Sequence, residues 1–380
     1  RKYFGIPVNS DKDAVFSYHF YRLLQRASRV FLIYDTEPDN FGSGEKSRFI
    51  TQLETEYTSS VIRNYIFSSD GFQLTNSKDI LIKKDLVLKD ILSWFDDGVS
   101  PSALIRYNNC SLSFYYYYLA KIRRDDEVAE FADNSVIGES IHKALELHLP
   151  IGKITTEHYK SIKNIIVDSV EDNFKKALQQ DKVVEGRNYL NLQVAKKMVK
   201  DFLLMEKNLV SQLALENKNL TIIEKELELA STICVDGHNV HLKGIADRID
   251  VLEDTIRIVD YKTGKITKED LYCKDLSMLK DIKKSKALQV LMYAYLYLKN
   301  HPEVLDKEVV AGDYSLKNLK DGLLTLSVDK NNIRYINQEL LNEFEYILKD
   351  ILQTILNNDF VKTTDLQRCK WCEYRNICNR

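Results

Sequence analysis

Asp247, Asp260 and Lys262 are ionisable residues in a stretch, residues 244–265, that is otherwise rich in branched apolar residues. Carboxylates buried beside isoleucines are unfavourable unless they are paired or bind a metal. A divalent cation held by both aspartates, with Lys262 adding positive charge nearby, removes this penalty. Such a centre suits phosphodiester hydrolysis, because metal ions activate water and neutralise charge at phosphorus. The alternative is a surface hairpin with solvated acids and a lysine in a salt bridge.

The elements that position these residues are two predicted antiparallel strands, 242–251 and 255–262, joined by a turn at Glu253-Asp254. Side chains in a strand alternate faces, so Asp260 and Lys262 share one face. With a loop of two or four residues, Asp247 lies directly opposite Asp260, where like charges destabilise each other. The hairpin therefore predicts a cation site between the two carboxylates.

Two predicted helices add polar residues at a spacing of four. In Gly138-x3-His142 the histidine sits beside a core-facing apolar stripe (Ile137, Ile141, Ala144, Leu145 and Leu149). In Gln289-x3-Tyr293 an amide and a phenol share one helix face, where they can orient DNA or a catalytic group. Taken alone, each pattern is more often ordinary helix packing.

Three of the six cysteines close the chain as Cys369-x2-Cys372-x5-Cys378. The CxxC spacing lets two thiolates face one metal, and the third lies just beyond. Tetrahedral coordination needs a fourth ligand, for which Cys110 is the candidate. The other two cysteines are predicted to be unligated thiols (Cys234 and Cys273). The alternatives are a small zinc site or reduced free thiols.

In this order, the motifs resemble the RecB-type branch of the PD-(D/E)XK nucleases, in its iron–sulfur form. The greatest likeness is to the C-terminal nuclease domain of AddB-type helicase–nuclease subunits, and CRISPR-associated RecB-like exonucleases share the same order. The resemblance covers roughly residues 98–380. It implies an α/β fold, namely a restriction-endonuclease-like core whose mixed central sheet is flanked by helices.

The resemblance also implies roles for the residues of the centre. His142, Asp247 and Asp260 would be metal ligands, together with the backbone carbonyl of Tyr261. Lys262 would orient the attacking water and stabilise the charge that develops at phosphorus. The metal would be Mg²⁺ or Mn²⁺, because carboxylates suit both ions and a histidine ligand also suits Mn²⁺.

Further roles follow from the same likeness. Gln289 and Tyr293 would support the site and the DNA backbone, and Glu226 would be an additional acid near the metals. The four cysteines would hold a 4Fe–4S cluster, with zinc as the alternative occupant (Cys110, Cys369, Cys372 and Cys378). Ser111 follows the first cysteine where the family commonly has proline, which removes no functional group.

Length and composition favour a soluble cytoplasmic enzyme. The chain has 380 residues, 44% of them hydrophobic, and a formal net charge of −2, which argues against a protein that coats nucleic acid. No signal peptide and no apolar run of membrane-spanning length occur in the sequence, so we expect no membrane partner. Thiols without a disulfide framework favour the cytoplasm.

Two domains are predicted. Residues 1–97 form a small helicase-like α/β remnant, and residues 98–380 form the nuclease domain with its iron–sulfur staple. Within the first, helices are expected over 13–29 and 45–65, and a buried strand over 30–35. Residues 150–220 are expected to form long charged helices. The chain begins with arginine rather than methionine, which indicates a fragment of a longer protein.

The function predicted is a metal-dependent DNA exonuclease, the nuclease part of an AddB-like helicase–nuclease that acts on DNA ends in recombinational repair. DNA and a helicase subunit would be its partners. The alternatives are a standalone single-strand DNA exonuclease, a catalytically silent module that binds DNA ends, and a zinc-stapled structural domain with an incidental acidic hairpin.

Overall fold

The computed structural model describes residues 9–34, 46–57, 62–63, 65, 80–123, 132–179, 183, 185–328 and 335–379. The chain divides into two compact units. The smaller one comprises Arg1–Thr75 with Glu185–Arg187, and the larger one comprises Asn76–Val184 with Asn188–Arg380.

The smaller unit contains two helices, α1 (Asn9–Gln25) and α2 (Arg48–Glu56), whose Phe20 and Phe49 rings stack. The predicted helices over 13–29 and 45–65 correspond to these two, although part of the second prediction lies outside the described residues. The predicted strand over 30–35 is wrong: residues 30–34 form no strand and are exposed, and Asp35 lies outside the described residues. A strand needs a partner, and the described part of this unit offers none.

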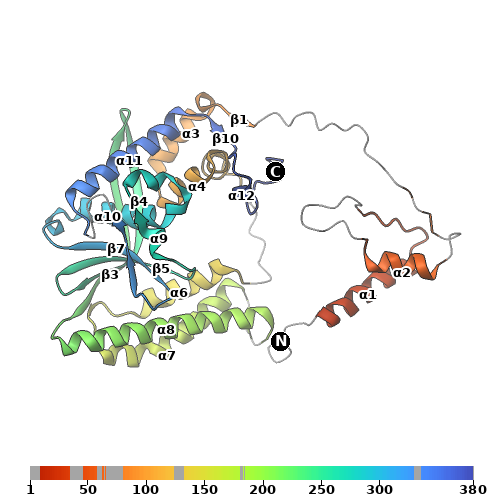
Figure 1. The fold of residues 1–380 in the computed structure, drawn as a ribbon, viewed down its shortest axis with the longest axis horizontal. Coiled ribbons are helices and arrows are strands. Elements are labelled where there is room, and N and C mark those ends of the chain that lie inside the picture. The colour runs from red at the N-terminus through yellow and green to blue at the C-terminus, as the bar shows by residue number, and fades with distance from the viewer. Residues whose placement is uncertain are drawn as a thin grey trace. The chain divides into compact units, whose positions relative to one another are not determined.

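A mixed sheet forms the centre of the larger unit (Figure 1). Its strand order is β2-β3-β4-β5-β7-β8, and β5 and β7 are its parallel pair. The strands are β2 (Gly152–Lys153), β3 (Leu220–Val235), β4 (His238–Leu252), β5 (Thr255–Lys262), β7 (Val309–Ser315) and β8 (Leu323–Thr325). The turn between β3 and β4 is Asp236-Gly237, both with positive φ, which suits the twist of a tight hairpin.

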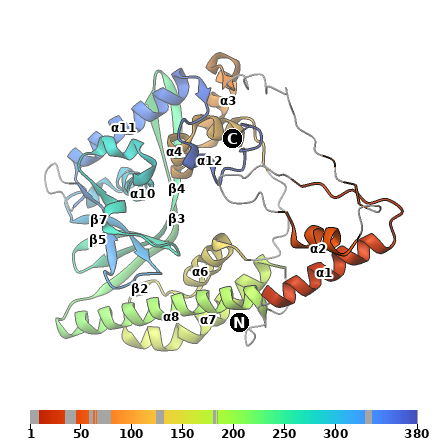
Figure 2. The same ribbon diagram turned by 45° about the vertical axis from the view of Figure 1, so that its right-hand side comes forward.

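Helices cover both faces of this sheet (Figures 1 and 2). One hydrophobic core joins the sheet to α3 (Lys84–Asp97), α4 (Pro101–Asn109), α10 (Ser285–Asn300) and α11 (Gln338–Asn357). A second core joins it to α6 (Asn134–His148), α7 (Thr156–Ala177) and α8 (Gly186–Leu215), and α7 and α8 run side by side. The predicted α/β fold with a mixed sheet between helices is therefore confirmed, as are the long helices within 150–220.

Short elements complete the unit. They are β1 (Leu81–Ile82), α5 (Ser111–Phe114), the π-helix η2 (Tyr115–Leu119), α9 (Lys268–Leu271), β6 (Tyr272–Cys273), η3 (Leu276–Lys280), η4 (Ile282–Lys284), η5 (Pro302–Val304), β9 (Ser327–Val328), β10 (Phe360–Val361) and α12 (Leu366–Cys369). β1 pairs with β10, and β6 pairs with β9. The first of these pairings holds the C-terminal segment beside the start of the unit.

Helix α10 is the interior helix of the fold. Its residues Ala287, Leu288 and 290–298 are all buried, as expected for a helix that is apolar on every side. It lies in the long crossover between β5 and β7, and parallel strands require such a crossover. Its position above the sheet brings Gln289 and Tyr293 to the hairpin residues described below. No helix in the described part of the chain is long and apolar enough to cross a membrane.

Candidate active site

The β4–β5 hairpin has the predicted register. Leu252 pairs with Thr255 across a two-residue turn, and Arg248 pairs with Val259. The same register carried one residue further places Asp247 opposite Asp260. Both carboxylates are buried, with side chains of Asp247 and Asp260 that are 9% and 3% exposed. The predicted hairpin and the predicted juxtaposition of the two acids are thus both found.

His142 on α6 reaches the same place. Its Nε2 lies 2.8 Å from the carbonyl oxygen of Tyr261, and its Nδ1 lies 3.4 Å from Oδ2 of Asp247. The backbone N–H of Tyr261 donates to that same Oδ2 at 2.6 Å. His142 therefore contacts the Tyr261 carbonyl and Asp247, two of the predicted metal ligands, through its two ring nitrogens.

Glu226 on β3 joins this group. One ligand atom each of His142, Glu226 and Asp247 lies within 4.8 Å of the other two. Lys225 pairs with Arg248 and Leu227 with Ala246, so Glu226 comes from the register position beside Asp247. Its φ of 45° is in the left-handed region, which is strained for a glutamate and is common at functional sites. The sequence signal for this residue was only an acid within a strand-like segment.

The charges of the centre shift one another's pKa values. Burial lowers the pKa of His142, but the hydrogen bond and charge of Asp247 and the charge of Asp260 outweigh it and raise that pKa to about 9. Burial and the charge of Asp247 raise the pKa of Asp260 to about 6 and that of Glu226 to about 7. Protons bound to these groups thus offset part of the repulsion between the carboxylates, which a bound cation would also reduce.

Lys262 and the residues of α10 complete the site. Lys262 Nζ lies 2.6 Å from Oδ2 of Asp260, and against the effect of burial the charge of Asp260 raises the lysine's pKa. Gln289 Nε2 donates to the Tyr293 hydroxyl at 2.8 Å and lies 3.4 Å from Oδ1 of Asp260. Gly244 on β4 lets the Tyr293 ring approach, since a Cβ there would lie 3.0 Å from two ring carbons. The predicted site residues from the hairpin and both helices therefore meet.

Sequence analysis missed Asp313, which lies on β7 directly in register with Asp260. Asp313 is fully buried. Its strand follows the hairpin after a long crossover, so its register with β5 depends on the fold. The only signal in the sequence was an aspartate within an otherwise mostly apolar stretch.

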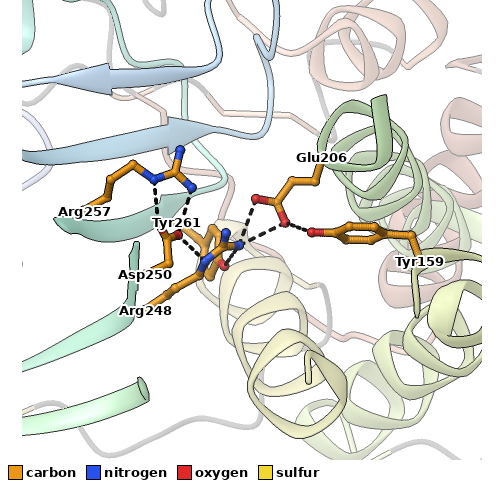
Figure 3. A network of polar contacts seen from close by, with 6 residues as sticks. All are labelled: Tyr159, Glu206, Arg248, Asp250, Arg257 and Tyr261. Carbon is orange, nitrogen blue, oxygen red and sulfur yellow. Dashed lines mark hydrogen bonds and ion pairs between the residues drawn. The ribbon is translucent and has the colours of Figure 1, made fainter. Parts of the chain in front are cut away.

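A buried ionic network lies beside the hairpin (Figure 3). Arg248 is completely buried and contacts Glu206 of α8 at 2.9 Å and Asp250 at 2.6 Å. Asp250 also pairs with Arg257, and the Tyr159 hydroxyl of α7 donates to Glu206 at 2.8 Å. Because Arg248 follows Asp247 along β4, this network ties helices α7 and α8 to the strand that presents the acid.

Four cysteines line one pocket at the C-terminal segment, together with Arg368, Arg375 and Lys362 (Cys110, Cys369, Cys372 and Cys378). None of the four is in a disulfide bond. Burial and the charges of the other three cysteines raise the pKa of Cys378, which reflects their proximity. Cys234 is exposed on β3 and Cys273 is buried on β6, and neither lines this pocket. The structure therefore brings together the four cysteines that the sequence analysis predicted as ligands of one metal site.

Comparisons with known proteins agree with this arrangement. Residues 98–379 match the family described as the PD-(D/E)XK nuclease superfamily, a span that includes every site residue above. A search of curated proteins found no match. The solved structure titled "Crystal structure of SSO0001" is 16% identical, over 63% of this chain and 94% of that chain, with a TM-score of 0.22. A TM-score this low carries no weight for the fold or the function.

Proposed function

Because the chain belongs to the PD-(D/E)XK nuclease superfamily, we propose that it is a Mg²⁺- or Mn²⁺-dependent DNA exonuclease. The observation that carries the proposal is the convergence of His142, Asp247 and the Tyr261 carbonyl, with Lys262 held at Asp260. Carboxylate, carbonyl and imidazole ligands suit these two ions. A bound divalent cation supplies charge neutralisation at phosphorus and a more acidic water.

The protein's own residues have distinct tasks in this proposal. His142, Asp247 and the Tyr261 carbonyl, with Asp260 and Glu226, would hold the cation. Lys262 would orient the attacking water and stabilise the developing negative charge, since its ammonium stays protonated beside Asp260. Gln289 holds the Tyr293 hydroxyl and contacts Asp260, so both would fix the position of that carboxylate.

The finer role rests on the order of motifs in the sequence. We propose an AddB-like nuclease that acts on DNA ends in recombinational repair, in the cytoplasm, beside a helicase subunit, with residues 1–97 as a helicase-like remnant. Helix α3 (Lys84–Asp97), which this division assigns to the remnant, packs into the larger unit. A catalytically silent end-binding module and a standalone single-strand exonuclease are the competing roles.

The cysteine pocket supports a second component of the proposal. Four thiols around one pocket match the ligand number of a 4Fe–4S cluster, and also of a structural zinc ion. We propose the iron–sulfur cluster, because the spacing Cys369-x2-Cys372-x5-Cys378 with a distant Cys110 resembles the iron–sulfur nucleases. Its task would be to join the C-terminal segment to the helix that ends at Asn109.

The test is cleavage of end-labelled linear DNA and of a covalently closed circle of the same sequence, with Mg²⁺, Mn²⁺ or EDTA. The proposal expects metal-dependent loss of nucleotides from the linear DNA and an intact circle. Cleavage of both substrates would support nuclease activity but would exclude an exonuclease, which needs a DNA end. Tight binding of ends without cleavage, by protein whose Mn²⁺ binding is demonstrated, would favour the silent module.

A further inference from the structure

Lys225 on β3 is joined to the end of helix α6, the helix that carries His142. Its Nζ donates to the backbone carbonyls of Glu146 and Leu149. In a continuing helix the Glu146 carbonyl would accept from the N–H of residue 150, but that residue is proline and has none. Lys225 therefore supplies the donor that the sequence of α6 does not provide at this end.

Glu226, the next residue along β3, belongs to the candidate metal group with His142 and Asp247. In a regular strand Lys225 and Glu226 would point to opposite faces of the sheet. The φ of 45° at Glu226 breaks this alternation, so both side chains lie beside α6. Because Glu146 is four residues after His142, the two neighbouring residues of β3 meet successive turns of that helix.

The left-handed conformation of Glu226 is strained for a residue with a side chain, so the surrounding contacts must maintain it. Lys225 is fixed on two sides directly before this residue. Its backbone pairs with Arg248 of β4, and its side chain binds the end of α6. Burial lowers the pKa of Lys225, but two carbonyls need only two N–H donors, which the charged and the neutral amine both carry. The contact with α6 therefore does not depend on the charge of the lysine.

We propose that Lys225 is a positioning residue, which holds the carboxylate of Glu226 beside His142 and Asp247 by binding the terminal carbonyls of α6. This inference rests on the proposed function, in which those three side chains hold the catalytic cation. Groups that orient the ligands of a metal commonly affect its affinity strongly without touching it. If the lysine acted through its charge instead, its removal would strengthen Mn²⁺ binding, because a nearby positive charge repels the cation.

The test compares wild type with Lys225→Met, which keeps an unbranched apolar side chain and removes the amine. The matched control is Lys243→Met. Lys243 lies on β4 and donates to the carbonyl of Asp97 at 2.6 Å, so it also caps a helix, but that helix, α3, carries no proposed ligand. Mn²⁺ affinity is measured by calorimetry without DNA, together with the melting temperature and the single-turnover cleavage rate. The same measurements are made on Glu226→Gln with and without Lys225→Met.

We expect Mn²⁺ affinity to fall about tenfold in Lys225→Met and to stay within about twofold of wild type in Lys243→Met. Both variants lose a helix-capping contact, so their melting temperatures should be similar. In the Glu226→Gln background, Lys225→Met should change the affinity by less than about threefold, because the residue that it positions no longer offers a carboxylate. Lys225→Arg keeps the N–H donors and should retain most of the wild-type affinity.

Unchanged or stronger Mn²⁺ binding by Lys225→Met would overturn the inference. Equal losses of affinity in the two lysine variants would do the same, since that is the result of a merely structural role. A full tenfold loss in the Glu226→Gln background would show that Lys225 does not act through Glu226. If wild type binds Mn²⁺ but does not cleave DNA, the nuclease proposal fails, and the affinities still decide the role of Lys225.

Discussion

At the scale of single residues, the site is a set of charges whose protonation depends on its neighbours. His142, Asp260 and Glu226 all have pKa values above their ordinary values. A cation competes with these protons for the same atoms, so metal binding releases protons. Raising the pH and adding a divalent metal are therefore expected to change the stability of the protein in opposite directions.

The metal-free protein should lose stability as pH rises from about 6 to about 9. His142 binds its proton more tightly in the folded state, so its contribution is full below its unfolded pKa and disappears as pH passes about 9. The raised pKa values of Asp260 and Glu226 act in the same sense near pH 6 and 7. We expect the melting temperature to fall by about 5 °C over this range, and saturating Mn²⁺ to reverse the fall.

The control is His142→Asn, whose melting temperature should change less than that of wild type between about pH 7 and pH 9, because the group that titrates there is absent. An identical pH dependence in the two proteins would show that the proton on His142 does not contribute to stability.

At the scale of elements, the hairpin could be predicted because both signals are local. Alternating apolar residues define β4 and β5, and a two-residue turn fixes their register. Asp247 opposite Asp260 follows from these facts alone. Glu226 could be placed near the metals only through the family resemblance, because its position depends on a backbone conformation, φ 45°, that glutamate seldom adopts.

The place of Asp313 was hidden from sequence reasoning. The register of parallel strands β5 and β7 is set by the crossover through α10 and by its packing, and not by a turn. The failed strand over residues 30–35 shows the converse: an apolar run has strand propensity but forms a strand only where a partner is available.

The contact between β4 and α10 predicts the effect of Gly244→Ala. The added Cβ would lie 3.0 Å from the Tyr293 ring and 3.3 Å from Leu296 Cδ1, so these side chains must give way by a few tenths of an ångström. We expect a loss of about 1–2 kcal/mol in unfolding free energy, measured by urea denaturation, and slower DNA cleavage. Gly264→Ala is the control, because nothing lies within 4 Å of its added Cβ. Equal stability of the two variants would contradict the close packing of α10 on β4.

The buried network predicts a larger effect at α8. Glu206→Ala leaves Arg248 buried with Asp250 as its remaining carboxylate partner, and should lower the unfolding free energy by about 3 kcal/mol. Lys197→Ala removes an exposed ion pair with Asp201 on the same helix and should change it by less than about 0.5 kcal/mol. Urea denaturation measures both, and similar values for the two variants would mean that Arg248 finds another partner.

At the scale of the whole molecule, residues from both ends of the matched region meet at the cysteine pocket. The pairing of β1 with β10 and the hydrogen bonds between Ser111 and Val361 place Cys110 beside the C-terminal cysteines. The sequence suggested Cys110 as the fourth ligand because tetrahedral coordination needs one, and the family resemblance agreed, although spacing alone says nothing about a cysteine so far upstream. The identity of the bound metal stays a prediction.

Cys372→Ser tests that prediction against Cys234→Ser, which changes an exposed cysteine outside the pocket. After anaerobic purification we expect wild type and the control to be brown and to contain iron. Cys372→Ser should lose the iron and melt at lower temperature, because the C-terminal segment is no longer tied to the rest of the domain. Zinc in place of iron in wild type would contradict the prediction of an iron–sulfur cluster but would still support a structural metal site at these cysteines.

The central claim is that the hairpin carries the catalytic centre of a nuclease, and Lys262→Ala tests it most directly. The control is Lys265→Ala, an exposed lysine three residues further along. Single-turnover degradation of end-labelled linear DNA with Mn²⁺ is measured for wild type and both variants. We predict that Lys262→Ala lowers the rate at least about a hundredfold, since the ammonium group stabilises the transition state, and that Lys265→Ala cleaves at nearly the wild-type rate. Undiminished, metal-dependent cleavage by Lys262→Ala would place the catalytic centre elsewhere.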